Sequence, residues 1–107
     1  MKIHREKLAW AAGFFEGEGC FHRNKGSSKN SSPDYGTLQI AQVNPEPLDK
    51  FRAVFPFLYP ARPQGKNQIW ALRSGKFEHV QAVVAALWPW LSTKRRQQAK
   101  LALTGVK

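Results

Sequence analysis

The chain begins with a stretch in which apolar side chains recur at helical spacing. Within Glu6 to Gly17, the residues Leu8, Ala12 and Phe15 fall at i, i+4 and i+7, and this period predicts a helix with one stripe against a core. A second stripe lies on another side of the same helix and consists of Trp10, Gly13 and Gly17. A helix with two such stripes is expected to bury two faces, so it needs two partners.

After this helix the pattern changes to the period of a strand. Phe21 alternates with the polar residues around it. Tyr35 to Val43 alternates again, with Leu38 and Ile40 on the face toward the core, as a half-buried strand should. The polar loop Lys25 to Asp34 lies between them, so the two strands are predicted to pair as a hairpin.

A second strand pair is expected further along the chain. Arg62 to Gln64 and Gln68 to Arg73 flank a turn at Gly65 to Asn67. Trp70 and Leu72 mark the core face of the second of these strands, because they alternate with the residues of the opposite face.

Three further helices are predicted from their stripes and their ends. Asn44 and Pro45 are typical of a helix start, and the apolar stripe that follows ends before Pro60 and consists of Leu48, Phe51, Val54 and Phe55. Ser74 is expected to cap the next helix, which Pro89 closes and whose apolar face is Phe77, Val80, Val84 and Leu87. Thr93 to Leu103 is predicted as a last, strongly basic helix.

The predicted order is helix, two strands, helix, two strands, helix, helix. In a chain of 107 residues this order indicates one α+β domain, 1–107, with an antiparallel four-stranded sheet covered by helices on one face. The other face then carries residues that donate and accept hydrogen bonds or neutralise phosphate: His22, Asn24, Tyr35, Thr37, Gln39, Arg62, Gln64, Lys66, Asn67 and Arg73. Strand pairs can read base edges in the major groove of DNA, although from this pattern alone an ordinary solvated face is the simpler interpretation.

Charge and composition narrow the class of partner. The chain has 17 Lys and Arg against 7 Asp and Glu, a formal charge of +10, which favours a polyanion, either nucleic acid or an anionic membrane surface. Cys20 is the only cysteine, so an internal disulfide and a multi-cysteine zinc site are excluded, and we expect it to be a small buried residue. No run approaches the roughly 20 apolar residues of a membrane span, so we expect a soluble intracellular protein.

One motif gives the pattern a specific interpretation. The segment Ala11 to Gly19 (AAGFFEGEG), extended as WAAGFFEGEGCF from Trp10 to Phe21, resembles the signature of the LAGLIDADG homing endonucleases. Small residues at Gly13 and Gly17 let two copies of such a helix approach closely, and an acid stands at its end. The predicted order of elements is similar to the αββαββα half of that family, and the resemblance covers nearly the whole chain.

The resemblance implies a homodimer. Family members carry one motif or two, and this chain has one copy without an internal repeat, so two chains are needed to bring two acids to two scissile phosphates. The dimer interface carried over onto this sequence consists of Trp10, Gly13, Glu16 and Gly17. Two sheets then form a DNA-binding saddle, and the target is expected to be nearly palindromic. The resemblance thus implies double-stranded DNA and a second copy of the chain as partners, with no membrane partner and no small-molecule substrate.

The resemblance also implies the chemistry of the site. Glu18 takes the position of the family's last motif acid, where it coordinates a divalent ion together with the backbone carbonyl of Gly17; hard oxygen ligands suit Mg²⁺, or Mn²⁺ or Ca²⁺ in its place. The usual residue at this position is Asp, so the longer Glu18 could shift the metal. Gln42 is expected at the active site, with a structural role at the strand end as the alternative.

Basic residues complete the implied site. Lys94 occupies a region where the family commonly has a basic residue near the scissile phosphate, and its alternative role is a phosphate clamp within the cluster that includes Arg95 and Arg96. His22 and His79 are not expected to be metal ligands, because no second His or Cys has suitable spacing.

Three functional hypotheses follow from the sequence. The first is a metal-dependent homing endonuclease that cuts both strands of a pseudo-palindromic DNA site, encoded by a mobile intron or by a free-standing gene. The second is a catalytically degenerate DNA-binding protein, such as a repressor. The third is an RNA-binding intron maturase. Glu18, Gln42 and Lys94 together favour the enzyme, because a protein that only binds DNA has no need of a carboxylate facing phosphate.

Overall fold

The computed structural model describes residues 4–26, 34–66 and 68–104. The order of elements confirms the predicted one and adds a short 3₁₀ helix before the last α-helix. The elements are α1 (Arg5–Glu18), β1 (Gly19–Asn24), β2 (Tyr35–Gln42), α2 (Glu46–Val54), β3 (Arg62–Gln64), β4 (Ile69–Ser74), α3 (Phe77–Leu87), η1 (Trp88–Trp90) and α4 (Thr93–Leu103).

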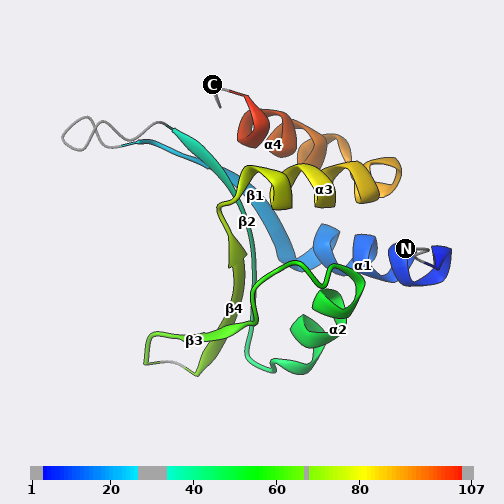
Figure 1. Cartoon of the computed structure of the whole chain (residues 1–107). Coiled ribbons are helices and arrows are strands. Elements are labelled where there is room, and N and C mark those ends of the chain that lie inside the picture. Colours follow the sequence, from blue (N-terminus) through cyan, green and yellow to red (C-terminus); the bar gives the residue numbers. More distant parts are fainter. Residues whose placement is uncertain (1–3, 27–33, 67, 105–107) are drawn as a thin grey trace.

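The strands form one antiparallel four-stranded sheet in the order β1-β2-β4-β3. All the helices lie on one face of this sheet, and the strands curve away from them, so the opposite face is open and concave (Figure 1). The predicted layer arrangement, with helices on one face of an antiparallel sheet, is therefore confirmed.

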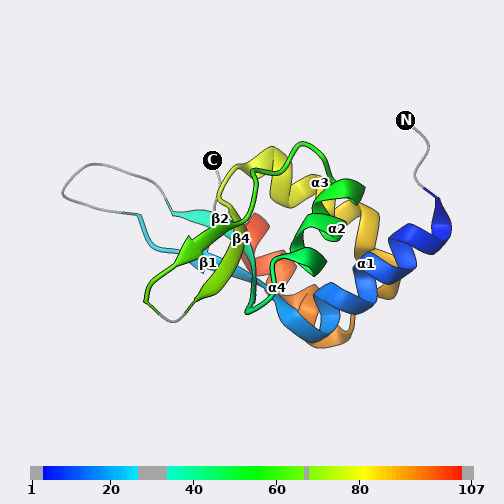
Figure 2. The ribbon, with the colours of Figure 1, turned by 90° about the horizontal axis from the view of Figure 1, so that it is seen from below.

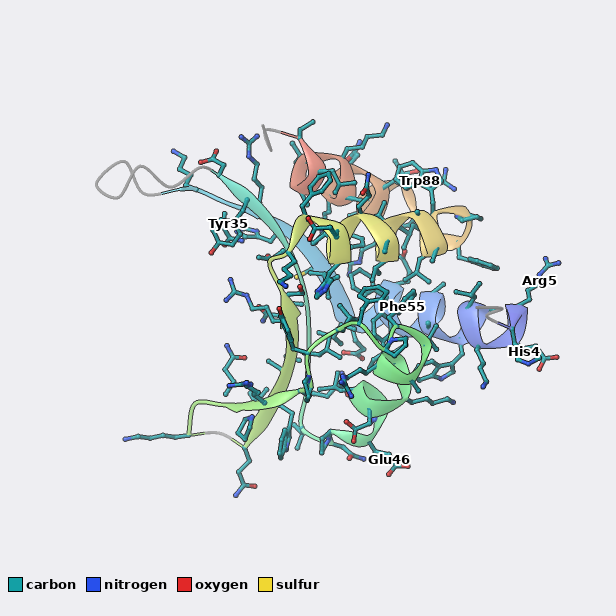
Figure 3. The ribbon with its side chains drawn as sticks, viewed as in Figure 1. His4, Arg5, Tyr35, Glu46, Phe55 and Trp88 are labelled. Atoms are coloured by element: carbon teal, nitrogen blue, oxygen red, sulfur yellow. The ribbon has the colours of Figure 1, made fainter. Side chains whose placement is uncertain are left out.

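The core lies between the sheet and the helices. Phe15, Leu38, Ile40, Phe51 and Leu72 are fully buried there, as the predicted stripes require. Figure 3 shows Phe55 inside the helical layer, whereas Tyr35 projects on the open side of the sheet. The core is thus made by one face of the sheet, and the other face is left for a different role.

α4 covers the outer edge of the sheet at close range. A side chain at Gly36 of β2 would run into the backbone carbonyl of Ala102 in α4, so only glycine allows this approach. β1 is an edge strand, and the amide of Phe21 finds its acceptor in Gln98 Oε1 of α4, at 3.3 Å. α4 thereby satisfies an amide of the edge strand that a further strand would otherwise have to pair with.

Two predictions about single residues are wrong. Ser74 does not cap α3: it ends β4, and the residue before the first turn of α3 is Lys76, which makes no side-chain cap bond. The Ser74 hydroxyl instead accepts from the Lys76 amide and bonds to His79 Nδ1 at 2.7 Å. Cys20 is half-exposed rather than buried, because strand alternation places it on the open face.

α1 lies at the rim of the helical layer. Figure 2 shows α2 and α3 on one side of it, and its N-terminal end projecting beyond the other helices. Its buried side carries Ala11, Ala12 and Phe15, and its C-terminal end leads directly into β1 at Gly19. None of the helices in the described part of the chain is long and apolar enough to cross a membrane.

Candidate nucleic-acid interface and metal site

The strand register defines which side chains share the open face. Cys20, Gln39 and Arg73 form one row across β1, β2 and β4, and Ala41, Ala71 and Arg62 form a second row across β2, β4 and β3. Successive residues of a strand point to opposite faces, so the open face also carries His22, Asn24, Tyr35, Thr37, Gln64 and Ile69. Nearly all the side chains predicted for the open face are therefore brought together there.

The electrostatics of this open face are one-sided. The seven carboxylates of the chain lie on helices or loops, and none is on a strand: Glu6, Glu16, Glu18, Asp34, Glu46, Asp49 and Glu78. Arg62, Arg73 and the hairpin residue Lys66 are exposed. A concave surface with cations and amides but no acid suits a polyanion. Asn67 was also predicted here and lies outside the described residues.

Two shallow hollows mark this face. Each has a volume of about 280 Å³, and both are lined by Arg73 and by the exposed Tyr59, from the loop before β3. Tyr59 was missed in the sequence, since it belongs to no strand and only the folded loop places it beside β4. Its ring extends the open face beyond the strands.

Thr37 does not fit its predicted role as a DNA contact. It is only 3% exposed, its hydroxyl accepts from Asn24 Nδ2 at 3.1 Å, and it donates to the carbonyl of His22 at 3.4 Å. The bonds within the β1–β2 hairpin use the groups that were expected to face bases. Thr37 therefore orders the hairpin, while Asn24 remains half-buried at its surface.

The end of α1 carries oxygen donors that could hold a cation. Glu18 is exposed, and among the described residues its carboxylate takes part in no hydrogen bond or ion pair. Of the last carbonyls of α1, that of Phe15 accepts from the Gly19 amide and that of Glu16 accepts from Arg95. If α1 continued, the amide of Phe21 would donate to the Gly17 carbonyl, four residues earlier. This amide donates to Gln98 instead, so it does not occupy the Gly17 carbonyl.

This donor set fits a hard divalent ion. The Glu18 carboxylate and the Gly17 carbonyl are oxygen ligands, which Mg²⁺ and Ca²⁺ prefer, and the C-terminal end of a helix favours positive charge. No group of three or more His, Cys, Asp or Glu residues that could hold a metal occurs in residues 4–26, 34–66 and 68–104. One chain therefore supplies only part of a coordination shell.

Hydrogen bonds join the start of α4 to the end of α1 and to β1. We call the residues that make them the Arg95 network: Glu16, Phe21, Ser92, Arg95 and Gln98. Arg95 Nη2 donates to the Glu16 carbonyl at 3.1 Å and Nη1 donates to Gln98 Oε1 at 3.2 Å. The Ser92 amide donates to Glu16 Oε1 at 2.9 Å. This bond uses the Glu16 carboxylate within the chain, and the place of Glu16 in a dimer interface stays a prediction.

The charge state of Glu16 follows from this network. Partial burial raises the pKa of its carboxyl, but the hydrogen bonds from Ser92 and the positive charges of Arg95 and Lys94 outweigh burial and hold the pKa below its ordinary value of 4.5. Glu16 is thus ionised at neutral pH, and its charge helps to fasten α1 to the start of α4.

The two arginines predicted as DNA contacts are engaged inside the chain. Arg95 serves the Arg95 network, and Arg96 donates from Nε and Nη2 to the Trp88 carbonyl at 3.2 and 3.0 Å, with its guanidinium 5.0 Å from the Trp88 ring centroid. Neither is therefore kept among the DNA contacts. Lys94 is exposed in the first turn of α4, close enough to Glu16 to affect its pKa.

Gln42 lies beside the junction of α1 and β1. It is the last residue of β2 and pairs with Trp70, and alternation places its side chain on the helical side of the sheet with Ile40. The last β1–β2 pair joins Ile40 to Gly19, the residue after Glu18. Gln42 lies two residues further along β2, where the neighbouring chain is the end of α1. Its position is next to the candidate metal site, and among the described residues no hydrogen bond joins it to Glu18.

Gly13 and Gly17 form an exposed stripe on α1. A Cβ added at either residue would meet nothing within 4 Å in the part of the chain that the structure describes, so no described residue covers this side of α1. Trp10 borders the stripe but is half-buried: its ring stacks on Phe14 at a centroid distance of 5.1 Å, and Lys50 Nζ lies 4.2 Å from its centroid. The second stripe predicted from the sequence is thus a glycine surface with an aromatic border.

The comparisons with known proteins give the fold. The sequence matches no protein-family model, and no curated protein matches it. Among solved structures, the homing endonuclease I-CvuI in complex with its target is similar with a TM-score of 0.79 and 23% identity, covering 92% of this chain and 64% of that one. The group I intron-encoded homing endonuclease I-CeuI, complexed with DNA, gives 0.76 and 16%, covering 94% and 53%.

A third similar structure belongs to a protein named after the same motif. It is the LAGLIDADG meganuclease I-AabMI bound to uncleaved DNA, with a TM-score of 0.72 and 18% identity, covering 91% of this chain and 35% of that one. The chain therefore has the fold of the LAGLIDADG homing endonucleases, which confirms the resemblance at the level of fold. It spans about two thirds or less of the length of these proteins.

Proposed function

We propose that this chain is one subunit of a homodimeric, divalent-metal-dependent DNA endonuclease of the LAGLIDADG type. The observation that carries the proposal is the placement of Glu18. Its carboxylate is exposed, has no bonding partner among the described residues, and stands at the end of α1, between the open glycine stripe and a sheet face that carries no acid. A carboxylate at the margin of a polyanion-binding surface is unfavourable unless a cation joins it to phosphate.

The proposed partner is double-stranded DNA, held on the open sheet face. The similar proteins I-CvuI and I-CeuI were solved with DNA, and an antiparallel strand pair fits the major groove. Gln39 and Gln64 offer amides that can pair with adenine, and Arg62 and Arg73 offer guanidinium groups that can pair with guanine. His22, Asn24, Tyr35 and Lys66 complete the proposed contacts at the two hairpins.

The proposed dimer places two copies of α1 against each other through Gly13 and Gly17. Among the described residues, a Cβ added at either glycine meets nothing within 4 Å outside its own helix turn, which leaves room for a second backbone. Such an arrangement is symmetric, so the same surface serves both subunits. It joins two concave sheet faces into one saddle and brings one Glu18 from each subunit to the two DNA strands.

Each residue of the proposed site has its own role in DNA cleavage. Glu18 and the Gly17 carbonyl hold Mg²⁺ or a similar ion, which supplies neutralisation of phosphate charge and activation of water when bound. I-CvuI was solved in the presence of 2 mM Ca and of 2 mM Mg. Gln42, beside the α1–β1 junction, orients the water, and the exposed Lys94 neutralises charge on the phosphate.

A cleavage selection tests this function. A randomised duplex library is incubated with the protein and Mg²⁺, and cut molecules are sequenced. The parent should yield pseudo-palindromic sites, and Glu18→Gln should yield none while still binding the selected duplex. The matched control is Glu78→Gln, at an exposed acid on α3, which should behave as the parent.

Two other outcomes would overturn the proposal. Duplexes that the parent binds but never cuts would indicate a DNA-binding protein and not an enzyme. Tight binding of a structured intron RNA that survives Glu18→Gln would instead indicate a maturase.

A further inference from the structure

We propose that Arg95 is a positioning residue for the metal-holding turn at the end of α1. The inference rests on the proposed function, because only that function assigns a metal to Gly17 and Glu18. Two contacts carry it: Arg95 Nη2 to the Glu16 carbonyl at 3.1 Å and Nη1 to Gln98 Oε1 at 3.2 Å. The first of these fixes the peptide that immediately precedes Gly17.

The turn is held on both sides from the same helix. Gln98 Oε1 accepts from Arg95 and also from the amide of Phe21 at 3.3 Å. Glu16 precedes the metal-holding residues and Phe21 follows them, so α4 fastens the segment 16–21 before and after Glu18. The second fastening of Glu16, from the Ser92 amide to its carboxylate, limits rotation of the last turn. Groups that orient metal ligands in this way set their geometry without touching the ion.

The guanidinium is used for its shape. A planar fork can donate to two acceptors in one plane, whereas a lysine ammonium is a point charge on a flexible stem. Arg95 is half-buried, and its Nε is a buried donor without a hydrogen-bond partner among the described residues. Burying an unpaired donor costs free energy. The two bonds from Nη1 and Nη2 must therefore offset this cost, because they keep the guanidinium in place while Nε stays without a partner in the described part of the chain.

Charge and geometry make opposite predictions for this residue. A cation near the metal repels it, so removal of the positive charge alone should raise metal affinity. Loss of the fork should lower metal affinity, because the Glu16 peptide and Gly17 carbonyl lose their fixed direction. Arg95→Lys keeps the charge and removes the fork, so it isolates the geometric effect.

Arg96→Lys is the matched control. Arg96 follows Arg95 on α4, is half-buried as well, and also donates from its guanidinium to a backbone carbonyl, that of Trp88. Its contacts lie on η1 and not on α1. Both substitutions remove a similar internal bond, so a general loss of stability affects both variants and a loss of metal-site geometry affects only one.

The test measures metal binding without reference to cleavage. Amide signals of the ¹⁵N-labelled full chain are followed while Mn²⁺ is added, first alone and then with a duplex that the protein binds. Paramagnetic broadening at Gly17, Glu18 and Gly19 is expected for the parent and should be lost in Glu18→Gln. Arg95→Lys should need about 10- to 100-fold more Mn²⁺ for the same broadening, whereas Arg96→Lys should match the parent.

The outcomes separate this inference from the proposed function. Broadening in the parent with equal Mn²⁺ requirements for Arg95→Lys, Arg96→Lys and the parent would refute the positioning role and leave the metal site standing. No broadening at Glu18 in the parent under either condition would overturn the metal site and this inference with it. If Arg95→Lys does not fold, Gln98→Met replaces it, since it removes the shared acceptor; a raised Mn²⁺ requirement supports the proposal and a parental value refutes it.

Discussion

Alanine substitutions at Gly13 and Gly17 distinguish the role of the glycine stripe within one subunit from its role between subunits. Both glycines lie inside α1 and are exposed, and an added Cβ meets nothing within 4 Å. Within a single chain, Gly→Ala in a helix interior should therefore stabilise the fold by about 0.5–1 kcal/mol, because alanine loses less backbone freedom on folding.

The expectation reverses if two copies of α1 pack against each other. An extra methyl group in a packed contact costs about 1–3 kcal/mol. Twofold symmetry introduces the group twice, so each substitution should cost the dimer roughly 2–6 kcal/mol, which raises its Kd about 30-fold to more than 10,000-fold. The same change thus stabilises the subunit and weakens the assembly.

Sedimentation equilibrium over a range of protein concentrations measures the association, and thermal unfolding measures the stability. Ala85→Gly, at an exposed position of α3, is the control: it should cost about 0.5–1 kcal/mol of stability and leave association unchanged. The parent should also melt at a temperature that depends on its concentration. If Gly13→Ala and Gly17→Ala both raise the Tm and leave association unaltered, the glycine stripe is not the dimer interface.

Three further outcomes are expected. Arg73→Ala should weaken binding of the selected duplex by about 1–3 kcal/mol if the guanidinium reads a base, as measured by gel shift; an unchanged Kd would remove Arg73 from the interface. The folded-state pKa of Glu16 lies below its ordinary value, so its stabilising effect is present above the unfolded-state pKa and is lost as pH falls through the folded-state pKa. Glu16→Gln should therefore flatten the acid side of the stability profile in urea titrations, and an identical profile would contradict the bond to Ser92. Gly36→Ala should destabilise the chain by at least about 1–3 kcal/mol, since the new methyl meets the Ala102 backbone; a parental denaturation midpoint would show that α4 can move.

Local signals predicted the fold well. The last helix begins and ends where its sequence indicates, at Thr93 and Leu103. Its start is set by Ser92, which caps it by accepting from the Arg95 amide at 3.2 Å. The strand alternation at Leu38 and Ile40 likewise fixed which face is buried. The prediction for Ser74 was wrong because its hydroxyl, although it precedes the helix, accepts from the amide of Lys76, which lies before the first helical residue. The same hydroxyl also bonds to His79.

Contacts between distant elements could not be predicted from the sequence. The basic run at the start of α4 suggested a phosphate clamp, but Arg95 reaches a carbonyl that lies 79 positions earlier in the chain. Only the packing of α4 against β1 creates that contact. Thr37 belongs to a strand position on the open face, yet it is buried and its hydroxyl accepts from Asn24. The pattern therefore defines faces, while the partner of each polar group depends on tertiary structure.

The central claim is that two copies of this chain cut DNA, each with its own Glu18. It is tested most directly with a supercoiled plasmid that carries one selected site, treated in Mg²⁺ with the parent, with Glu18→Gln, and with dimers refolded from an equal mixture of both. We expect the parent to produce linear plasmid, the mixture to add nicked circles from dimers with one active acid, and Glu18→Gln to leave the plasmid supercoiled. Linear plasmid from Glu18→Gln at the rate of the parent would contradict the claim.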